Sequence, residues 1–519
     1  MSLKRVGGLL GIGLSLAIIA GCGGGGGSQE SAGGKIDENA TLRAGWTVGV
    51  KTLDPHMAYS EVVSFRFGLN AVYDRLFTVD ATGAVKGMLV DTWAYSDDGL
   101  ELDLKLREDV TFRDGSKLDA EVVKVNLDRA RTLESPIVKA KVANIKSVDI
   151  AGPFELKLSL DKPTVSDPYE LANVSGFIMH PDLIKNGDPA KETNGSGAYE
   201  VDKWVPGETL NLVRDRDDYW DTKAAKIAKL EHQAIPDFQA FSNALAGGQI
   251  DIGQFQPSQV ASLENQPGLK TVRVPQGIGI DLQLNFKMKP LDSLKVRQAI
   301  NYAYDRKGIV DALYPGSVAK YQPYREGLPG YDKALETSYS FDTAKAKSLL
   351  ADAGYPEGID LGEILVSTAV TPGLVDVLQK QFAAAGIKFK PLTVDAAQIF
   401  ARWAAGKDSA ALQFASTGTE PGAGASRRWK APSSNPAGTD AEFEKLLAAG
   451  MDNRISPEAR DEAYQKLSRY TVEQAWAAPV VWNNFPWVMT DRLQNFSAKM
   501  DYATLDGPYD FRYLTMTTK

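Results

Sequence analysis

Residues 101–122 read ELDLKLREDVTFRDGSKLDAEV and contain, in succession, the sequence signals of a strand, a turn and a helix. Three leucines alternate with polar residues over 101–107, which predicts a strand with one buried face. Asp114-Gly115 predicts a turn after this strand, because both residue types favour turn conformations. Asp119 then predicts a helix start, since its carboxylate can accept hydrogen bonds from free backbone N–H groups. The stretch therefore predicts a strand, a turn and a helix in a region of mixed α and β structure.

The rest of the chain repeats these signals and shifts toward helices in its second half. Residues 154–160 alternate like the first strand, and a short strand is expected at 387–390. Helical spacing predicts helices over 296–304, 342–350 and 374–382, and one that begins at Ser456-Pro457-Glu458. The C-terminal half therefore reads as αβ units, and the fold class is α/β.

The first 22 residues have the composition of an export signal. Lys4 and Arg5 precede an apolar run over 6–20, which is too short to span a bilayer, and small residues lead up to Cys22. Residues 1–21 therefore predict a signal peptide. The segment resembles a bacterial lipobox, which implies lipid attachment at Cys22; the alternative is an ordinary secretory signal with a buried thiol. Residues 22–40 are rich in glycine and predict a flexible tether.

Length, charge and composition exclude several classes of protein. The 519 residues exceed what one core usually organises, so two or three domains are expected. The chain carries 58 Lys and Arg against 66 Asp and Glu, and removal of Lys4 and Arg5 with the signal shifts the net charge from −8 to −10, which argues against nucleic acid as a partner. Cys22 is the sole cysteine, and the three histidines lack ligand spacing, so we expect no disulfide, metal site or other cofactor.

Several further strings resemble, in order, the family-5 extracellular solute-binding proteins of ABC importers, the dipeptide, oligopeptide and nickel-binding group. Besides residues 93–122, they are Thr52-Leu53-Asp54-Pro55-His56, 72–76, 194–199 followed by Trp204 and Asp218-Tyr219-Trp220, 296–306 and 346–356. A match to any one of these strings is weak evidence for the family, but the order and spacing of all of them together are specific to it. Most are read as structural: Arg297, Asp305 and Arg306, for example, are expected to pair within a helical layer.

The resemblance implies a bilobal, type II periplasmic-binding-protein-like fold whose lobes close on a ligand by hinge motion, with an additional α+β domain on lobe one. By motif position, lobe one comprises 41–75, 194–283 and 488–519. The additional domain comprises 76–193, and lobe two comprises 284–487.

This chain departs from the peptide-binding members at two positions. Those members place an Asp for the ligand's amine shortly before an N-E-P or G-D-P turn; alignment of that turn with Glu420-Pro421 puts Phe414 at a family Trp and Thr417 at the Asp. Dipeptide binders also place an Arg for the carboxylate where Thr371 precedes Pro372. Each charge-assisted hydrogen bond contributes roughly 1.5–3 kcal/mol, so ordinary free dipeptides are expected to bind poorly and neutral, N-blocked or anionic solutes better.

The expected ligand site combines hydroxyl, aromatic and basic side chains from both lobes. Its predicted members are Thr47, Gln254, Phe255, Phe414, Ser416, Thr417, Thr419, Arg427, Arg428, Trp429 and Trp482. Arg427-Arg428-Trp429 could clamp an anionic or planar ligand, and the alternative is a solvated loop rim with Trp429 packed on the lobe.

The resemblance implies a monomeric, lipid-anchored binding protein on the outer face of the cytoplasmic membrane or in the periplasm, with an ABC permease as partner. A ligand-presenting sensor is the alternative within binding proteins, and an envelope hydrolase is the alternative among enzymes. The sequence contains no G-x-S-x-G, no S-x-x-K with a downstream K-T-G and no P-loop, so no catalytic residues are expected.

Overall fold

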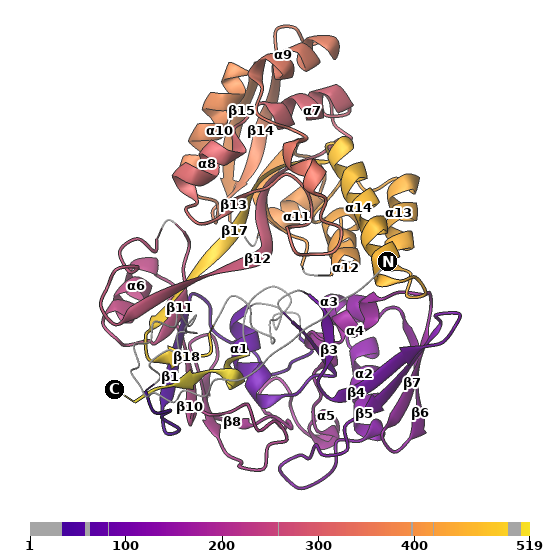
Figure 1. The fold of residues 1–519 in the computed structure, drawn as a ribbon, viewed down its shortest axis with the longest axis vertical. Helices are drawn as coiled ribbons and strands as arrows, with labels where there is room; N and C mark the ends of the chain where they lie inside the picture. The colour runs from indigo at the N-terminus through magenta and orange to yellow at the C-terminus, as the bar shows by residue number, and fades with distance from the viewer. Residues whose placement is uncertain are drawn as a thin grey trace, which may run out of the picture.

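The structure is a computed structural model and describes residues 34–57, 63–80, 83–257, 259–395, 398–418, 420–496 and 510–518. Two lobes lie one above the other, joined by two long strands (Figure 1). The signal peptide and Cys22 lie outside the described residues, as does Thr419. The mixed α/β class and the bilobal arrangement predicted from the sequence are both present.

One sheet runs through both lobes in the order β15-β14-β16-β12-β17-β11-β1-β10-β9-β8, and β13 pairs with β17 beside this path. The strands that both lobes share are β12 (Leu269–Leu284) and β17 (Ala477–Thr490), which are antiparallel to each other. The chain passes from lobe one to lobe two along β12 and returns along β17. Their register shifts between Pro275 and Gly279, where the strands leave one lobe and enter the other.

Lobe one contains strands β11, β1, β10, β9 and β8 of this sheet, together with the C-terminal segment. Its elements are β1 (Thr41–Trp46), α1 (Val63–Val72), β8 (Tyr199–Val205), β9 (Thr209–Arg214), β10 (Lys229–Ala234), α6 (Phe238–Ala246), β11 (Ile252–Gln254), β18 (Leu493–Gln494) and β19 (Thr515–Met516). The parallel pairs β1–β10 and β1–β11 bring the carboxyl ends of these strands to one edge, next to Thr47 and Gln254. That edge of an α/β sheet is where ligands commonly bind.

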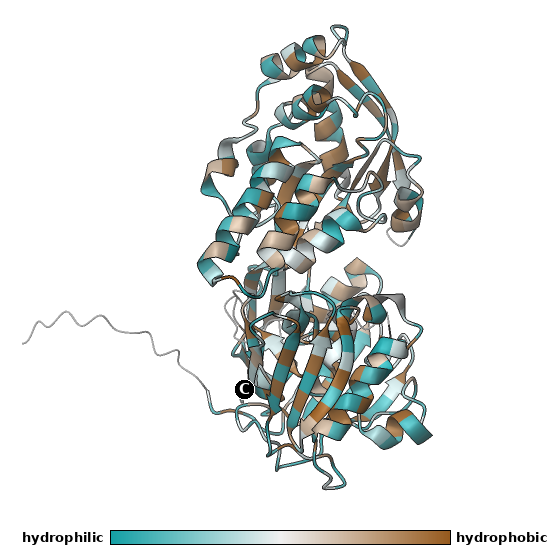
Figure 2. Cartoon of the chain, turned by 90° about the vertical axis from the view of Figure 1, so that its right-hand side faces the viewer, coloured by the Kyte–Doolittle hydropathy of each residue, from teal (hydrophilic) through white to brown (hydrophobic). Residues whose placement is uncertain are grey.

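A second, antiparallel sheet in the order β4-β5-β7-β6 lies beside lobe one. This region contains β2 (Phe77–Val79), β3 (Val85–Gly87), β4 (Val90–Tyr95), β5 (Glu101–Leu106), α2 (Ala120–Thr132), α3 (Pro136–Lys141), β6 (Ile145–Gly152), β7 (Glu155–Leu160), α4 (Ser166–Glu170) and α5 (Pro181–Asn186). Apolar and polar residues alternate on its strands, as Figure 2 shows, and the leucines of β5 are buried. One continuous apolar core joins this region to lobe one.

Lobe two surrounds the upper half of the shared sheet with helices. Its elements are α7 (Leu294–Tyr302), α8 (Arg306–Leu313), β13 (Val318–Ala319), α9 (Thr343–Asp352), β14 (Ile359–Ser367), α10 (Pro372–Ala384), β15 (Ile387–Val394), α11 (Ile399–Ala404), β16 (Ala410–Ser416), α12 (Pro421–Ala425), a π-helical turn (Ser426–Lys430), α13 (Ala441–Met451) and α14 (Pro457–Glu473). One core lies under α7–α10, and another joins α13, α14 and the π turn.

The structure contains the helix caps and helix ends that local sequence signals predicted. Asp119 caps α2 by accepting a hydrogen bond from Val122 N–H (3.1 Å), and Ser456 caps α14 in the same way. Gly386 takes a φ of +83° after α10, a conformation that favours glycine. The expected ion pairing of Arg297, Asp305 and Arg306 is wrong. Both arginines donate instead to backbone carbonyls, Arg297 to Gln474 O (2.9 Å) and Arg306 to Pro479 O (2.8 Å).

Candidate functional site

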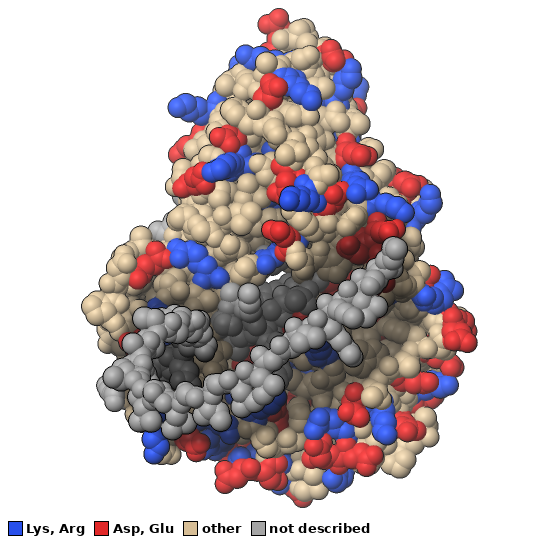
Figure 3. Space-filling model, viewed as in Figure 1, with Lys and Arg blue, Asp and Glu red and all other residues tan. Residues whose placement is uncertain are grey.

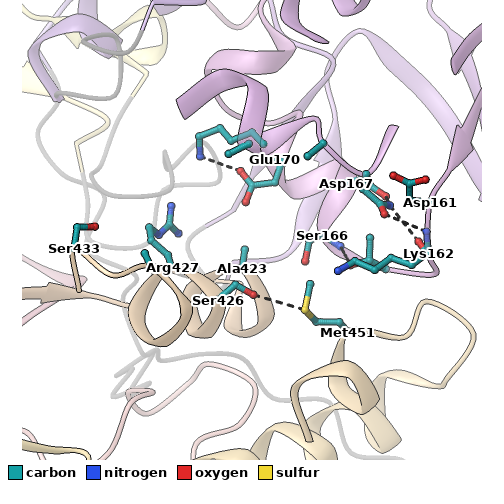
Figure 4. A pocket seen from close by; sticks show the side chains of 16 residues that line it. Asp161, Lys162, Ser166, Asp167, Glu170, Ala423, Ser426, Arg427, Ser433 and Met451 are labelled. Atoms are coloured by element: carbon teal, nitrogen blue, oxygen red, sulfur yellow. Dashed lines mark hydrogen bonds and ion pairs between the residues drawn. The ribbon is translucent and has the colours of Figure 1, made fainter. Parts of the chain in front are cut away.

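A cavity of about 940 Å³ lies between the two lobes. The molecule is hollowed between them on the face drawn in Figure 3, and Figure 4 shows the cavity from close by. One wall comes from α3, α4 and the loops beside them, and the other from α12, the π turn and the end of α13. The lining residues are Ala140, Lys141, Ala143, Asn144, Asp161, Lys162, Thr164, Ser166, Asp167, Glu170, Ala423, Ser426, Arg427, Ala431, Ser433 and Met451. Its size suits a small organic solute.

The wall from the second sheet region carries most of the charge. Lys141 Nζ forms an ion pair with Glu170 Oε2 at 2.9 Å. Asp167, only 3% exposed, accepts a hydrogen bond from Asn144 Nδ2 (2.8 Å). Burial raises the pKa of Asp167 to about 7, and the hydrogen bond from Asn144 opposes this rise. Burial therefore favours the protonated form of Asp167 more than that of an exposed aspartate.

The wall from lobe two is built of small residues around α12. Glu420 caps this helix and accepts hydrogen bonds from Gly422 N–H (3.0 Å) and from the Tyr464 hydroxyl (3.0 Å). Alanines at 423 and 431 leave room for an apolar part of a ligand, and Ser426 and Arg427 add polar groups to the same wall (Figure 4).

Hydrogen bonds bridge the two lobes beside this cavity. Ser166 Oγ donates to Glu420 Oε2 (3.0 Å). Val165 N–H donates to Met451 O (2.9 Å), and Asn453 Nδ2 donates to Gly99 O (3.0 Å). These contacts join loops that lie about 250 to 350 residues apart in the sequence, so the lobes contact each other in this conformation.

The predicted site residues of segment 414–429 do not all face the cavity. Phe414 and Ser416 lie on β16 near the hinge, where the Phe414 ring lies 6.3 Å from that of Phe485. Thr417 is buried, and its hydroxyl donates to Pro323 O (2.9 Å). Arg427 is the one predicted member among the described residues that lines the cavity.

Arg428 and Trp429 belong to the interior of lobe two, so the alternative of a solvated loop rim is wrong for Arg428. Arg428 forms an ion pair with Asp281 (3.4 Å), and its guanidinium lies 4.1 Å from the centre of the Trp429 ring. Trp429 packs on lobe two against Trp476 at 5.5 Å. Burial lowers the pKa of Arg428, and Asp281 opposes that change.

The remaining predicted residues lie at the hinge side of the cleft. Trp482 on β17 is 5% exposed, and Lys320 Nζ lies 4.0 Å from its ring centre. Thr47 follows β1, and Gln254 ends β11, both half-buried. Phe255 lies in an apolar core, stacked on Phe241 at 4.7 Å, which leaves its side chain no exposed surface toward the cleft. None of these four residues is among those that line the cavity to which Arg427 belongs, and their role in ligand binding stays a prediction.

The sequence reasoning missed the whole wall formed by residues 140–170. Ser166-Asp167-Pro168 has the composition of a helix start, and α4 does begin there. No periodicity or motif, however, indicates that α4 faces a helix that follows it by some 250 residues. The contact between the lobes places α4 and α12 in the walls of one cavity.

The described part of the chain holds no cluster of three or more histidine, cysteine, aspartate or glutamate side chains suited to a metal ion. Within the same residues, no helix has the length and hydropathy needed to cross a bilayer.

Comparison with known proteins decides the family. Residues 84–437 match the family described as "Bacterial extracellular solute-binding proteins, family 5 Middle". The chain belongs to this family. The resemblance that its motifs carry in the sequence is thereby confirmed, and it extends across both sheets and most of lobe two.

Individual relatives support the same assignment. The "Glutathione-binding protein GsiB" of Salmonella paratyphi A is 27% identical over 462 residues, which cover 84% of this chain and 86% of that protein. The structure of NikA from Brucella suis in complex with Fe(III)-EDTA matches with a TM-score of 0.80 at 24% identity, over 92% of this chain and 100% of the other. DppA from Helicobacter pylori, in complex with the peptide STSA, matches with a TM-score of 0.76 at 20% identity, over 93% and 99%. At these identities the structures show a shared bilobal fold.

Proposed function

We propose that this protein captures a small, polar organic solute between its lobes and delivers it to an ABC importer, without catalysis. The observation that carries the proposal is the cavity itself: its walls come from different lobes, and β12 and β17 carry the described chain from one lobe to the other. A solute held there contacts both lobes at once, so its binding energy favours the closed arrangement.

The ligand is peptide-like or another polar molecule of similar size. Relatives bind glutathione, a peptide or a metal chelate according to their names, all of them small molecules with several polar groups. Thr417 and Thr371 remove the two charges that suit a free dipeptide, and Thr417 is occupied by a hydrogen bond to Pro323 O. The selectivity against plain dipeptides stays a prediction.

Mass spectrometry of small molecules released from purified, denatured protein tests the proposal. We expect one class of solute in near-stoichiometric amount. The same solute should raise the melting temperature of refolded protein, because it binds the folded state alone. A protein that releases no solute and is stabilised by none of a panel of peptides, N-acylated peptides, oligosaccharides and aromatic acids would not be a solute receptor.

We also propose that Cys22 carries a lipid anchor and that the domain division predicted above holds. The anchor rests on the sequence alone: basic residues, an apolar run and the sole cysteine. Cys22→Ser should move the protein to the soluble fraction or leave an uncleaved precursor. Membrane retention of processed Cys22→Ser protein would contradict the anchor.

A further inference from the structure

Asp167 is a carboxylate in the cavity wall that forms no ion pair among the described residues, although the charge of Lys162 acts on it. The buried side chain of Asp167 accepts a hydrogen bond from the neutral amide of Asn144 at 2.8 Å. Figure 4 shows it in the cavity wall beside Asp161 and Lys162, with Glu170 nearer to Arg427. A buried carboxylate normally has a positive partner, because desolvation of the charge is costly.

Among the neighbouring charges, Lys162 lowers the pKa of Asp167 but forms no ion pair with it. Glu170 already pairs with Lys141, and the exposed Asp161 pairs with Lys146 at 3.2 Å. The titratable groups that surround Asp167 are Glu170, Lys162, Lys141, Tyr95 and, from lobe two, Arg427 and Glu420. Burial and the repulsion of Glu170 raise the pKa of Asp167, whereas Asn144 and Lys162 act against that rise. A positive group that arrives from the cavity would therefore stabilise the ionised carboxylate.

Helix α4 also lies against residues 417–418, where this chain has Thr417 in place of the aspartate of the peptide-binding members. The hydroxyl of Tyr169, two residues after Asp167, lies 2.8 Å from the position that a Cβ at Gly418 would take. Gly418 directly follows Thr417, and the resemblance to the peptide-binding members implies an aspartate for the ligand's amine at position 417. Helix α4 thus reaches this segment of the opposite lobe through Tyr169, whereas Asp167, two positions earlier on the helix, points to another side and accepts a hydrogen bond from Asn144.

We propose that Asp167 binds a cationic amine of the captured solute, as the acidic partner that this chain lacks at position 417. This inference rests on the proposed function, because it assigns the ligand class of the same cavity. It reverses the sequence-based expectation that N-blocked or anionic solutes bind better than amines. The solute carries a protonated amine at the α4 wall, and its other polar groups reach the serines and Arg427 of lobe two.

Asp167→Asn tests the assignment, with Asp149→Asn as the matched control. The asparagine keeps the size of the side chain and a hydrogen bond to Asn144, so the variant should fold with an unchanged or higher melting temperature. Asp149 is exposed on β6 of the same region, so its variant removes an equal charge away from the cavity. Solutes released from each protein are reacted with dansyl chloride, which labels amines, and quantified by mass spectrometry.

We expect wild type and Asp149→Asn to release a dansylated solute and Asp167→Asn to release at least tenfold less. In calorimetric titrations with trialanine, glutathione, their N-acetyl derivatives and putrescine, at least one amine should bind wild type. It should bind at least tenfold more tightly than its acetylated form, and this preference should vanish in Asp167→Asn.

Three results would overturn the inference: a released solute without an amine, equal retention by Asp167→Asn, or no binding of any amine in the panel at 1 mM (roughly −4 kcal/mol). A neutral or anionic solute that binds would leave the proposed function standing while it refutes the role of Asp167. Absence of every class of solute would refute both.

Discussion

Arg512 and Asp74 form the centre of a charge network buried in lobe one. Arg512 Nη1 lies 2.6 Å from Asp74 Oδ1, and both side chains are fully buried. Arg512 also pairs with Asp510, while Asp74 accepts a further hydrogen bond from the Tyr219 hydroxyl (2.6 Å). Burial alone would raise the pKa of Asp74, but Arg512 and these hydrogen bonds hold it below its usual range. The network attaches the C-terminal segment 510–518 to Asp74, which follows α1, and to Tyr219.

Arg512→Met should reduce the free energy of unfolding by about 3–5 kcal/mol, because it removes the cation that pairs with buried Asp74 and leaves buried Asp510 with Arg75 (3.7 Å) as its ion-pair partner. Urea denaturation followed by circular dichroism measures the change. Arg454→Met is the control: Arg454 pairs with Asp452 (2.7 Å) at the surface, where an ion pair contributes about 1 kcal/mol or less. Equal effects of the two substitutions would show that the buried network does not stabilise lobe one.

Two buried histidines predict how stability depends on pH. Burial lowers the pKa of His56 and of His232 to about 4, and the charge of Arg129 adds to the effect on His56. The unfolded chain protonates these side chains near pH 6.5, so between pH 6.5 and 4 it binds more protons than the folded protein. Stability should therefore fall as the pH drops through this window, by up to about 3 kcal/mol for each histidine.

The raised pKa of Asp167 has the opposite effect on the free energy of unfolding. Below pH 7 the folded protein binds a proton at Asp167 that the unfolded chain does not bind until about pH 4, so this group makes the protein more stable as the pH falls. His232→Gln separates the contributions. Urea denaturation between pH 4 and 7 should give a slope that is shallower by about 1.4 kcal/mol per pH unit in this variant. An unchanged slope would mean that His232 keeps its ordinary pKa in the folded protein.

At the scale of elements, the position of α12 depends on close contact with the end of β16. A Cβ added at Gly424 would lie 1.6 Å from Thr417 O, a backbone atom that cannot move aside cheaply. No larger residue fits there while α12 keeps its place in the cavity wall. Glu420 secures the same helix through its cap and its hydrogen bond to Tyr464.

Gly424→Ala should therefore destabilise the protein by about 1–3 kcal/mol and weaken solute binding, because α12 must shift. Gly373→Ala, in the first turn of α10, is the control, since its added Cβ would meet Leu313 at an ordinary 3.4 Å. Thermal unfolding and calorimetric titration with the co-purified solute measure both effects. If Gly424→Ala behaves like Gly373→Ala, the close packing of α12 is not required.

The sequence predicted the elements well where the signal is local, and the site poorly where it is not. The alternating leucines of β5 and the caps Asp119 and Ser456 act on neighbours within a few residues, so their elements were predictable. Arg428 looked like a cleft residue because nothing in the sequence shows its buried partner Asp281, 147 residues away. The predicted boundaries at 283 and 487 stay a prediction, although β12 and β17 each extend through both lobes.

At the scale of the whole molecule, two lobes with separate cores are connected by strands β12 and β17. Separate apolar cores fill lobe one and lobe two, and the register shift between Pro275 and Gly279 interrupts the pairing of β12 and β17 between them. Hydrogen bonds such as Ser166 to Glu420 bridge the lobes beside the cavity. Such a molecule can open by bending at two strands without loss of either core.

Small-angle X-ray scattering tests hinge closure on the solute most directly. The radius of gyration is measured on protein that carries its co-purified solute, on protein refolded after the solute has been removed, and again after the solute has been added back. We expect a larger radius for the emptied protein and a return to the smaller value on addition. An identical radius in all three samples, with the solute bound at saturation, would contradict capture by closure of the two lobes.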